Sequence, residues 1–541
     1  MDITASSSRA QNRDRWCLPL GLALLGTVIR IIVAFAMAPT IDEPSHISYA
    51  GMILKGKPDR PSVIYDSKVP ISVLNALPRA LGVFFRDRHT HPRLAGILLD
   101  LRITRYATVA ASFCLCLLVF AYADALFGRA AALFAELICV IEPNLIAHGT
   151  LSTTDLYIAA AAVFFLYCLR SFLLEPSARN ATLTAFALAL AQLTKFIGVY
   201  LYFALAIVLI AVNLCERFAP GKPFRIPRQR IALLLAVHAA FLIALLNVGY
   251  VFDRTFTPLA RYRFHTSAFE KLQRIPVLRS IPVPVPYPVL QGMDWINYDN
   301  STATAFGNVC VLNQVRGPTL PHHGGFLDYY LVAYALKEPL GFQLILLLSL
   351  ACIFRKRRFV EFLPNEGLLL ITAVVILVPL SLGNTQIGIR HMLPVLAFFT
   401  ILSGAAFQGW RTFTRRRRLL LRGCFLYAAI SVASYFPHMI PYFNEIVYDR
   451  RFAYRYLADS NLDYGQAQWV ADRFLKANPD VMFDPKQPVS GRFLLSGTVL
   501  AGHWPRNADN FARVRGLKPV AQVGYAYFLF DVPPPSRPSP N

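Results

Sequence analysis

The stretch Thr40–Tyr49, with the sequence TIDEPSHISY, follows the first long apolar run of the chain. It contains two adjacent carboxylates, Asp42 and Glu43, and an imidazole, His46. Ionised side chains are costly to bury in hydrocarbon, so an acidic pair at this edge is expected to face a water-filled cleft or to do chemistry. We therefore predict that the rest of the chain builds a cleft around Asp42. The alternative is that both acids are plain loop residues at a helix end.

The composition excludes a single soluble domain, because 55% of the 541 residues are hydrophobic and only 16% are charged. Such a balance is typical of a mainly α, polytopic membrane protein. The net charge of +23 could indicate a nucleic-acid partner, but the basic clusters lie between apolar runs, where they act as topology signals. Most of the nine cysteines lie inside apolar runs, so we expect neither a disulfide framework nor a CxxC metal site.

The apolar runs predict about eleven membrane spans. They lie at about 17–38, 106–127, 130–147, 156–174, 181–193, 199–214, 231–251, 327–354, 368–382, 392–410 and 419–436. The basic N-terminal segment places that end in the cytoplasm, and the count puts the densest short basic clusters on the same side. Asp42, Asp155, Lys195 and Arg390 then share the opposite, outer face.

The loops between these runs define the expected domains. The expected parts are a membrane domain at 1–436, with a first external loop at 39–105 and a proline-rich external lid at 252–326, an external α/β domain at 437–532 and a disordered tail at 533–541. In the first loop we expect helices at 73–85 and 94–99. In the external domain we expect a helix at 464–477 and strands at 492–495 and 526–532.

The groups on the outer face suit transfer from a phosphate-activated donor. A carboxylate takes the proton of an acceptor hydroxyl while cations neutralise the departing phosphate. The candidate catalytic residues are Asp42, Glu43 and Asp155, and the candidate phosphate-binding residues are Lys195, Arg390, His391 and Lys337.

Several of these residues have a second interpretation. Asp155, with the threonines before it, could cap the fourth span. Lys195 and Arg390 could extend to the membrane surface without a substrate role. His46 could bind a divalent cation with Asp42 and with Asp155 or His148, or it could simply hydrogen-bond the acids.

Eight motifs, in this order, resemble the bacterial branch of the GT-C membrane glycosyltransferases, the protein O-mannosyltransferase-like family that uses polyprenyl-phosphate sugars. They are Asp42–Tyr49, HGTLSTTD at 148–155, LTKF at 193–196, YY at 329–330, LKEPL at 336–340, GIRHMLP at 388–394, YFNE at 442–445 and DSNLDYGQ at 459–466. The chain departs from the family at Glu338, where relatives commonly have Thr, and at Tyr464, where they commonly have Trp.

The resemblance implies a GT-C fold and a polyprenyl-phosphate donor carrying a hexose or pentose, with inversion at the sugar. It also implies Asp42 as the base with Glu43 in support, although the choice of base between these two stays open. Asp155 is expected to help hold the acceptor or a metal, and Lys195 and Arg390 to hold the lipid phosphate. The expected location is a bacterial inner membrane with the site facing outward.

The acceptor remains open among lipid, glycan and protein hydroxyls. The absence of a MIR-like module leaves a protein acceptor unsupported. A transporter or lipid flippase is the alternative from another class, but such proteins tend to carry internal repeats and charges at the membrane midplane. A membrane scaffold is a third interpretation, and it leaves the gathering of acids and bases on one face unexplained.

Overall fold

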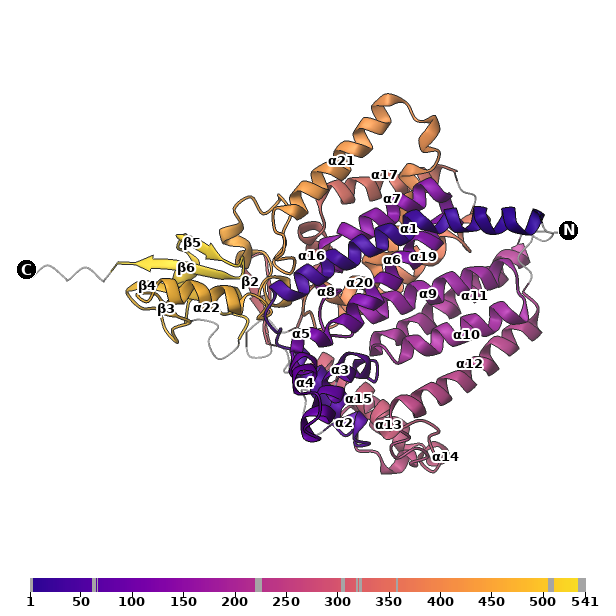
Figure 1. The fold of residues 1–541 in the computed structure, drawn as a ribbon. Coiled ribbons are helices and arrows are strands. Elements are labelled where there is room, and N and C mark those ends of the chain that lie inside the picture. Colours follow the sequence, from indigo (N-terminus) through magenta and orange to yellow (C-terminus); the bar gives the residue numbers. More distant parts are fainter. Residues whose placement is uncertain are drawn as a thin grey trace, which may run out of the picture.

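The computed structural model describes residues 3–60, 65, 67–218, 226–302, 307–317, 320, 324–356, 359–504 and 510–533. Within them, eleven helices form a bundle, and each predicted span overlaps one of these helices (Figure 1). They are α1 (Ile3–Ala36), α6 (Tyr106–Phe127), α7 (Arg129–Ile141), α9 (Asp155–Leu174), α10 (Ala178–Gln192), α11 (Tyr200–Phe218), α12 (Arg228–Gly249), α17 (Leu340–Lys356), α19 (Glu366–Leu382), α20 (Leu393–Ser403) and α21 (Arg415–Ala433).

Six stretches of the described chain are long and apolar enough to cross a membrane, and a seventh qualifies if a bent helix pair is one span. The six are Arg15–Ala36, Leu101–Phe127, Asp155–Leu174, Phe196–Leu214, Arg228–Gly249 and Ile389–Phe407. The polytopic membrane class is therefore confirmed. The number of helices that are long and apolar enough to span a membrane is smaller than the eleven predicted, because helices such as α7 and α10 are too short.

The predicted span at 327–354 is wrong as a single helix. It consists of α16 (Tyr329–Lys337) and α17, which meet at an angle of 114°. Pro339 causes the break, because a proline forces the residue before it into an extended conformation, and Glu338 has φ −96° and ψ 135°. As a result α16 turns away from the line of α17.

Burial separates the central helices from the outer ones. Of the most apolar 18 residues in the stretch that contains α20, 94% are buried. The corresponding share is 72% in α9 and 22% in α12. A helix that is apolar all round belongs either in a core or against lipid. Close packing needs small residues, and Gly341 of α17 lies so near the carbonyl of Cys424 in α21 that any side chain would collide with it.

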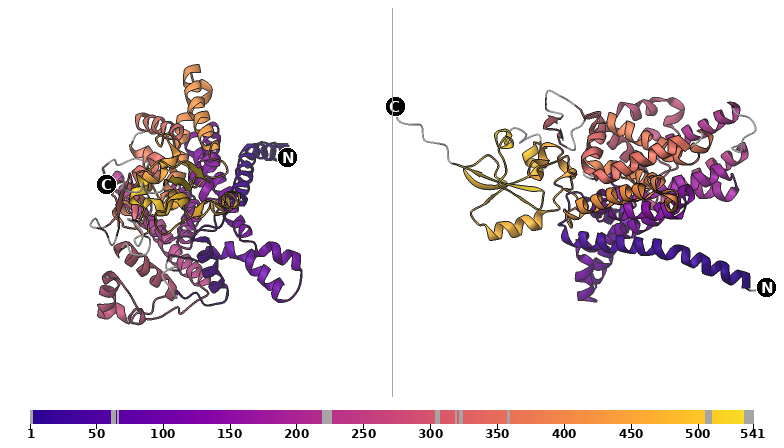
Figure 2. Two further views of the ribbon diagram at one scale, coloured as in Figure 1. Left: turned by 90° about the vertical axis from the view of Figure 1, so that its left-hand side faces the viewer. Right: turned by 90° about the horizontal axis from the view of Figure 1, so that it is seen from above.

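Short helices gather at one end of the bundle, away from the N-terminus (Figures 1 and 2). Those of the first loop are α2 (Glu43–Leu54), α3 (Ser72–Asp87), α4 (Pro92–Leu99) and α5 (Leu101–Thr104), and α8 (Pro143–His148) follows later. The predicted lid contains η3 (Leu259–Arg261), α13 (Ser267–Arg274), α14 (Pro276–Arg279), α15 (Tyr287–Thr302), β1 (Val309–Val311) and β2 (Gln314–Arg316). The structure thus has helices at 73–85 and 94–99, as expected.

A small α/β unit lies beyond the same end of the bundle (Figure 2). Its sheet has the order β3-β4-β6-β5, and β4 and β6 pair antiparallel with Phe493 opposite Phe530. The elements are η7 (Arg450–Arg455), η8 (Asp459–Asn461), α22 (Gln468–Ala477), β3 (Met482–Phe483), β4 (Gly491–Ser496), α23 (Gly497–Ala501), α24 (Ala512–Arg515), β5 (Ala521–Val523) and β6 (Tyr527–Val532).

The two predicted strands of this unit are confirmed by β4 and β6, but its helix begins at Gln468 rather than at residue 464. The residues before it, 463–466, are bound by side chains and backbone of other segments and are not free to extend the helix. The expected domain limits stay predictions. Of the expected disordered tail at 533–541, Pro533 is described and the rest lies outside the described residues.

A fully buried ion pair fixes the first loop to the bundle. Arg105 donates from Nε and Nη2 to the two carboxylate oxygens of Glu43 at 2.8 and 2.7 Å. The same guanidinium donates to the backbone carbonyls of Ala34, Met37 and Ala38, at and just beyond the end of α1. It therefore satisfies carbonyls that the helix leaves unpaired and sets the position of the neighbouring Asp42.

Replacing Glu43 with Gln leaves this buried guanidinium without its counter-charge. Because breaking a buried pair from one side strands the remaining charge, we expect a loss of about 3–5 kcal/mol in the free energy of unfolding. The measurement is thermal unfolding of the purified chain in detergent. Asp87→Asn, which changes an exposed acid of the same loop, is the matched control and should keep the wild-type melting temperature. An unchanged melting temperature in the Glu43 variant would show that the pair does not anchor the loop.

Candidate active site

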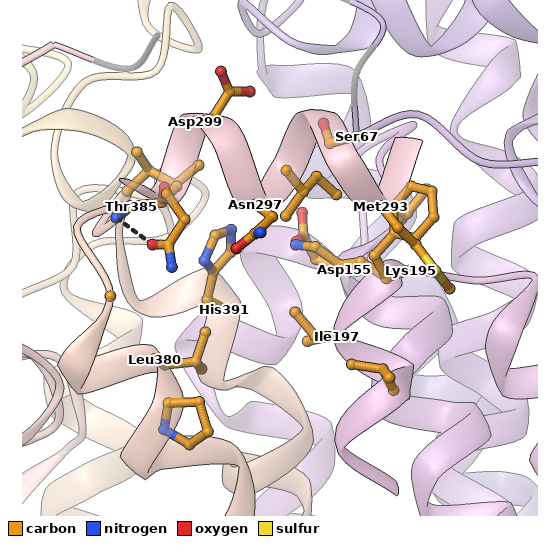
Figure 3. Close-up of a pocket in the computed structure, with 18 of the residues that line it drawn as sticks. Ser67, Asp155, Lys195, Ile197, Met293, Asn297, Asp299, Leu380, Thr385 and His391 are labelled. Carbon is orange, nitrogen blue, oxygen red and sulfur yellow. Dashed lines mark hydrogen bonds and ion pairs between the residues drawn. The ribbon is translucent and has the colours of Figure 1, made fainter. Parts of the chain in front are cut away.

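A cavity of about 380 Å³ lies at the end of the bundle where the short helices gather, beneath α15 (Figure 3). Its lining brings together residues from the first loop, the second loop, the end of α10 and the start of α20. Six of the residues expected at the site line it, and they are Asp42, His46, Asp155, Lys195, Arg390 and His391. Segments up to 348 residues apart in the chain therefore share one hollow, as the topology predicted.

Asp42 immediately precedes α2 and is held through one of its two oxygens. Its Oδ2 accepts a hydrogen bond from Arg390 Nη1 at 2.7 Å and another from the hydroxyl of Tyr464. No partner of Oδ1 is found among the described residues, and the side chain keeps 26% of its surface exposed. Oδ1 is therefore the oxygen that remains available to a substrate.

The charge of Asp42 is stabilised by its surroundings. Burial by itself raises the pKa of Asp42, but the positive charges of Lys68 and Arg390 outweigh it and hold that pKa well below its usual range. The carboxyl group is therefore ionised throughout the neutral range. An ionised carboxylate is the form that can accept a proton.

Tyr464 contacts Asp42 from the segment that precedes α22, and it was not among the expected site residues. The Tyr464 carbonyl accepts the amide of Ile41 at 3.0 Å, and the Gln466 carbonyl accepts the amide of Ala38 at 3.0 Å. Arg390 also donates to the Tyr464 hydroxyl. The two segments thus run together beside Asp42, and the Tyr464 hydroxyl, the Asp42 carboxylate and the Arg390 guanidinium form a closed triangle.

Asp155 and Lys195 form a second ion pair across the cavity. Asp155 is the first residue of α9, and its side chain bonds the ammonium of Lys195. The residue before it, Thr154, makes no capping bond through its side chain, so the structure does not favour the capping interpretation. Burial lowers the pKa of Lys195, and the charge of Asp155 works against that change.

Lys68 is a cavity residue that sequence reasoning missed. Its side chain is buried, it lines the cavity, and its Nζ lies 3.5 Å from the Ser67 hydroxyl. Within the described residues no carboxylate pairs with it. Lys195 and Arg390, by contrast, each contact a carboxylate. The cavity lining therefore holds three cations and, with Asp299, three carboxylates, and Lys68 is the cation that has no carboxylate partner among the described residues.

The three histidines of the predicted motifs differ in position. His46 Nδ1 lies 3.0 Å from the Ser72 hydroxyl, and burial lowers the pKa of His46 well below its usual range. His391 lines the cavity, and its Nδ1 has no partner among the described residues. His148 is buried at the end of α8 and does not line the cavity.

Two of the expected site residues lie outside the cavity lining. Glu43 holds the loop from behind, since its oxygens accept bonds from Arg105 and from the Ser152 amide at 2.9 Å. Lys337 donates to the carbonyls of Ile440 at 2.7 Å and Asn461 at 2.6 Å. Both side chains therefore act on the backbone around the site rather than facing the hollow, which corrects their expected positions.

The carboxylates are not arranged as a metal site. Within the described part of the chain, no group of three or more His, Cys, Asp or Glu side chains is placed to hold a metal ion. The expected ligands Asp42 and Asp155 are each bound to a cation, and His46 faces Ser72. This donor set does not fit a divalent cation, so no step below involves one.

The cavity has a polar roof and an apolar wall. Asn297 and Asp299 of α15 lie along the roof (Figure 3). Asn300 of the same helix accepts the amides of Asn384 and Thr385 at 2.9 and 3.2 Å, which closes α15 onto the end of α19. The wall consists of Phe196, Ile197, Val199, Tyr200, Pro379 and Leu380. A ligand with a polar head and a hydrocarbon tail fits this division.

A family model described as dolichyl-phosphate-mannose-protein mannosyltransferase matches residues 100–244, a segment that includes Asp155 and Lys195. The structure is similar to that of the Saccharomyces cerevisiae protein O-mannosyltransferase Pmt1-Pmt2 complex bound to the sugar donor. The two are 12% identical, with a TM-score of 0.51, over 78% of this chain and 89% of that one. The GT-C fold implied by the sequence is thereby confirmed.

Two further solved structures are similar at lower scores. ArnT from Cupriavidus metallidurans bound to undecaprenyl phosphate is 12% identical, with a TM-score of 0.48, over 94% of this chain and 96% of that one. The oligosaccharyltransferase AglB from Archaeoglobus fulgidus, in complex with an inhibitory peptide and a dolichol-phosphate, is 13% identical, with a TM-score of 0.41, over 78% and 56%. No curated protein matches the chain by sequence.

The buried His148 makes the stability of the chain depend on pH. Burial lowers its pKa from 6.5 to about 3, so below pH 6.5 the unfolded chain binds a proton that the folded chain excludes. The free energy of unfolding should therefore fall by about 2 kcal/mol between pH 7 and pH 5 on account of this residue. Melting curves at both pH values measure the change.

The variant His148→Asn cannot take up the proton. We expect its melting temperature to fall less between pH 7 and pH 5 than that of the wild type. An equal fall in both proteins would contradict the exclusion of the proton from His148.

Proposed function

We propose that this chain, a polytopic membrane protein of the GT-C fold, is a glycosyltransferase that moves a sugar from a polyprenyl-phosphate donor to an acceptor hydroxyl. The family match over residues 100–244 supports a membrane glycosyltransferase. The observation that carries the finer proposal is the buried cation Lys68, which no carboxylate pairs among the described residues, beside an ionised Asp42 whose Oδ1 is available. A buried ammonium without a carboxylate partner is suited to a lipid phosphate.

The phosphate of the donor is proposed to lie against Lys68. A sugar linked to a polyprenyl chain through a phosphodiester carries one negative charge, which Lys68, a cation without a carboxylate partner among the described residues, can pair. The hydrocarbon chain would leave along the apolar wall between Phe196 and Leu380, toward the exposed Val378 and Leu382 of α19. The related complexes named above contain dolichol-phosphate, undecaprenyl phosphate or a sugar donor, which supports this class of ligand.

Transfer then follows from the position of Asp42. The acceptor hydroxyl gives its proton to Oδ1 as its oxygen attacks the anomeric carbon, and the bond from that carbon to the phosphate oxygen breaks. The electron pair of that bond moves onto the leaving phosphate, which gains a second negative charge. Lys68 and the nearby Lys195 and Arg390 stabilise the developing charge, so no general acid is needed. Attack from the face opposite the phosphate inverts the sugar.

Donor binding also prepares the base. The cations Lys68 and Arg390 hold the pKa of Asp42 below its usual range. A phosphate that approaches the same cations offsets their effect, so the pKa of Asp42 rises and the carboxylate becomes a stronger base once the donor is present. Tyr464 fixes Oδ2, which keeps Oδ1 turned toward the acceptor.

The class of sugar, the acceptor and the cellular membrane are likewise proposed. The polar roof formed by α15 is the part of the cavity that a sugar would contact, through Asn297 and neighbouring side chains. A hexose or a pentose would both offer hydroxyls to it. The proposed location is a bacterial inner membrane, with the cavity at the outer end of the bundle. A transporter or flippase is the competing proposal, and it requires no proton acceptor.

The first test is the loss of the base. Asp42→Asn keeps the size and hydrogen-bonding shape of the side chain but cannot accept the proton, so we expect transfer to fall by about 10²–10⁴-fold. The assay scores release of polyprenyl phosphate from a panel of undecaprenyl-phosphate sugars. The control is Asp87→Asn, an exposed acid in the same loop, which should keep full activity. Undiminished transfer by the Asp42 variant would remove the mechanism.

The second test concerns Lys68. Lys68→Met removes a charge-assisted contact to the donor phosphate, so we expect KM for the donor to rise about 10–100-fold. The melting temperature should not fall, because Lys68 has no carboxylate partner to leave unpaired in the described structure. Lys55→Met, at an exposed position after α2, is the control. An unchanged donor KM in the Lys68 variant would place the phosphate elsewhere.

A further inference from the structure

A second hollow, of about 560 Å³, lies where α1 ends, between its last turn, α5 and α22. The apolar span of α1 ends at Ala36, so Phe35 in the lining marks the level at which the chain leaves the hydrocarbon. We name this hollow the α1–α22 groove. It is lined chiefly by Phe35, Arg102, His438, Trp469, Arg473 and Lys476. None of these residues lines the catalytic cavity.

The groove carries positive charge that the protein does not neutralise. Arg473 and Lys476 are exposed on successive turns of α22, and within the described residues neither side chain has an ion pair or hydrogen bond. Asp472 is the acid in the lining, and it is bonded to Gln468. Burial lowers the pKa of His438, and the nearby charge of Arg473 lowers it further. The His438 Nδ1 is buried without a partner among the described residues.

An apolar stripe on α1 leads directly into this groove. Leu24, Val28, Ile32 and Phe35 are exposed and recur at a helical spacing, so they lie along one face of the span. In a membrane that face contacts acyl chains. Trp469 lies at the groove end of the stripe, with the Arg102 guanidinium 5.7 Å from its ring centre. Tryptophan is enriched at the level of lipid headgroups.

We propose that the α1–α22 groove binds the phosphate headgroup of an anionic membrane lipid. Arg473 and Lys476 contact the phosphate, Trp469 lies beside the glycerol backbone, and the acyl chains follow the α1 stripe. Two unpaired cations favour a headgroup with net negative charge over a zwitterionic one. Each basic side chain near the membrane surface adds about 1 kcal/mol of attraction to anionic lipid. The lipid would thereby hold α22, and with it the segment that carries Tyr464, against the end of the bundle.

The test uses the full-length chain in detergent, titrated with phosphatidylglycerol brominated on its acyl chains. Bromine quenches nearby tryptophan, so the difference between the wild type and Trp469→Phe reports on Trp469 alone. We expect saturable quenching of Trp469. The double variant Arg473→Gln/Lys476→Gln should weaken the apparent affinity about thirtyfold.

Three comparisons make this result specific. Arg513→Gln/Lys518→Gln removes the same charge from exposed positions outside the groove and should leave the affinity unchanged. Brominated phosphatidylcholine should quench Trp469 weakly, and soluble glycerol phosphate should not displace the anionic lipid. The proposal fails if the groove variant with a wild-type melting temperature binds normally, if phosphatidylcholine binds equally well, or if glycerol phosphate binds as tightly as the lipid.

Discussion

The contact between Asp42 and Arg390 is the interaction on which the site depends. It joins the loop after α1 to the start of α20, and the Tyr464 hydroxyl closes the triangle from the C-terminal unit. Three separate parts of the chain must be in place before Asp42 has its position. Because Asp42 is the carboxylate that pairs with the buried Arg390, its loss leaves a guanidinium without a counter-charge, so the site and the fold are stabilised by the same contacts.

The adjacent acids Asp42 and Glu43 show how one short stretch divides two tasks. Glu43 faces the bundle, where Arg105 and the Ser152 amide bind both of its oxygens. Asp42 faces the cavity, where one oxygen is bound and the other is available. The buried pair fixes the backbone, and the fixed backbone aims the catalytic candidate. A carboxylate that did both tasks would have no free oxygen left for a substrate.

The sequence predicted more of the cavity than of its surroundings. Apolar periodicity and basic clusters were sufficient to place Asp42, Asp155, Lys195 and Arg390 on one face, because span order alone decides sides. Span order does not say which way a loop side chain points. For that reason Glu43 and Lys337 were expected in the cavity, whereas they bind backbone or a buried arginine behind it. Lys68 lies in an irregular segment that no pattern marked, and Tyr464 was noted only within the motif at 459–466, with no role at the site assigned to it.

The central claim is that the lipid phosphate lies beside Lys68 while Asp42 Oδ1 faces the acceptor side of the same cavity. The most direct measurement is an electron-microscopy structure of the chain in nanodiscs with undecaprenyl phosphate. This account predicts phosphate density within hydrogen-bond distance of Lys68 Nζ, with the polyprenyl chain along the wall of Phe196 and Leu380. Phosphate density outside this cavity, with Lys68 still unpaired, would contradict it.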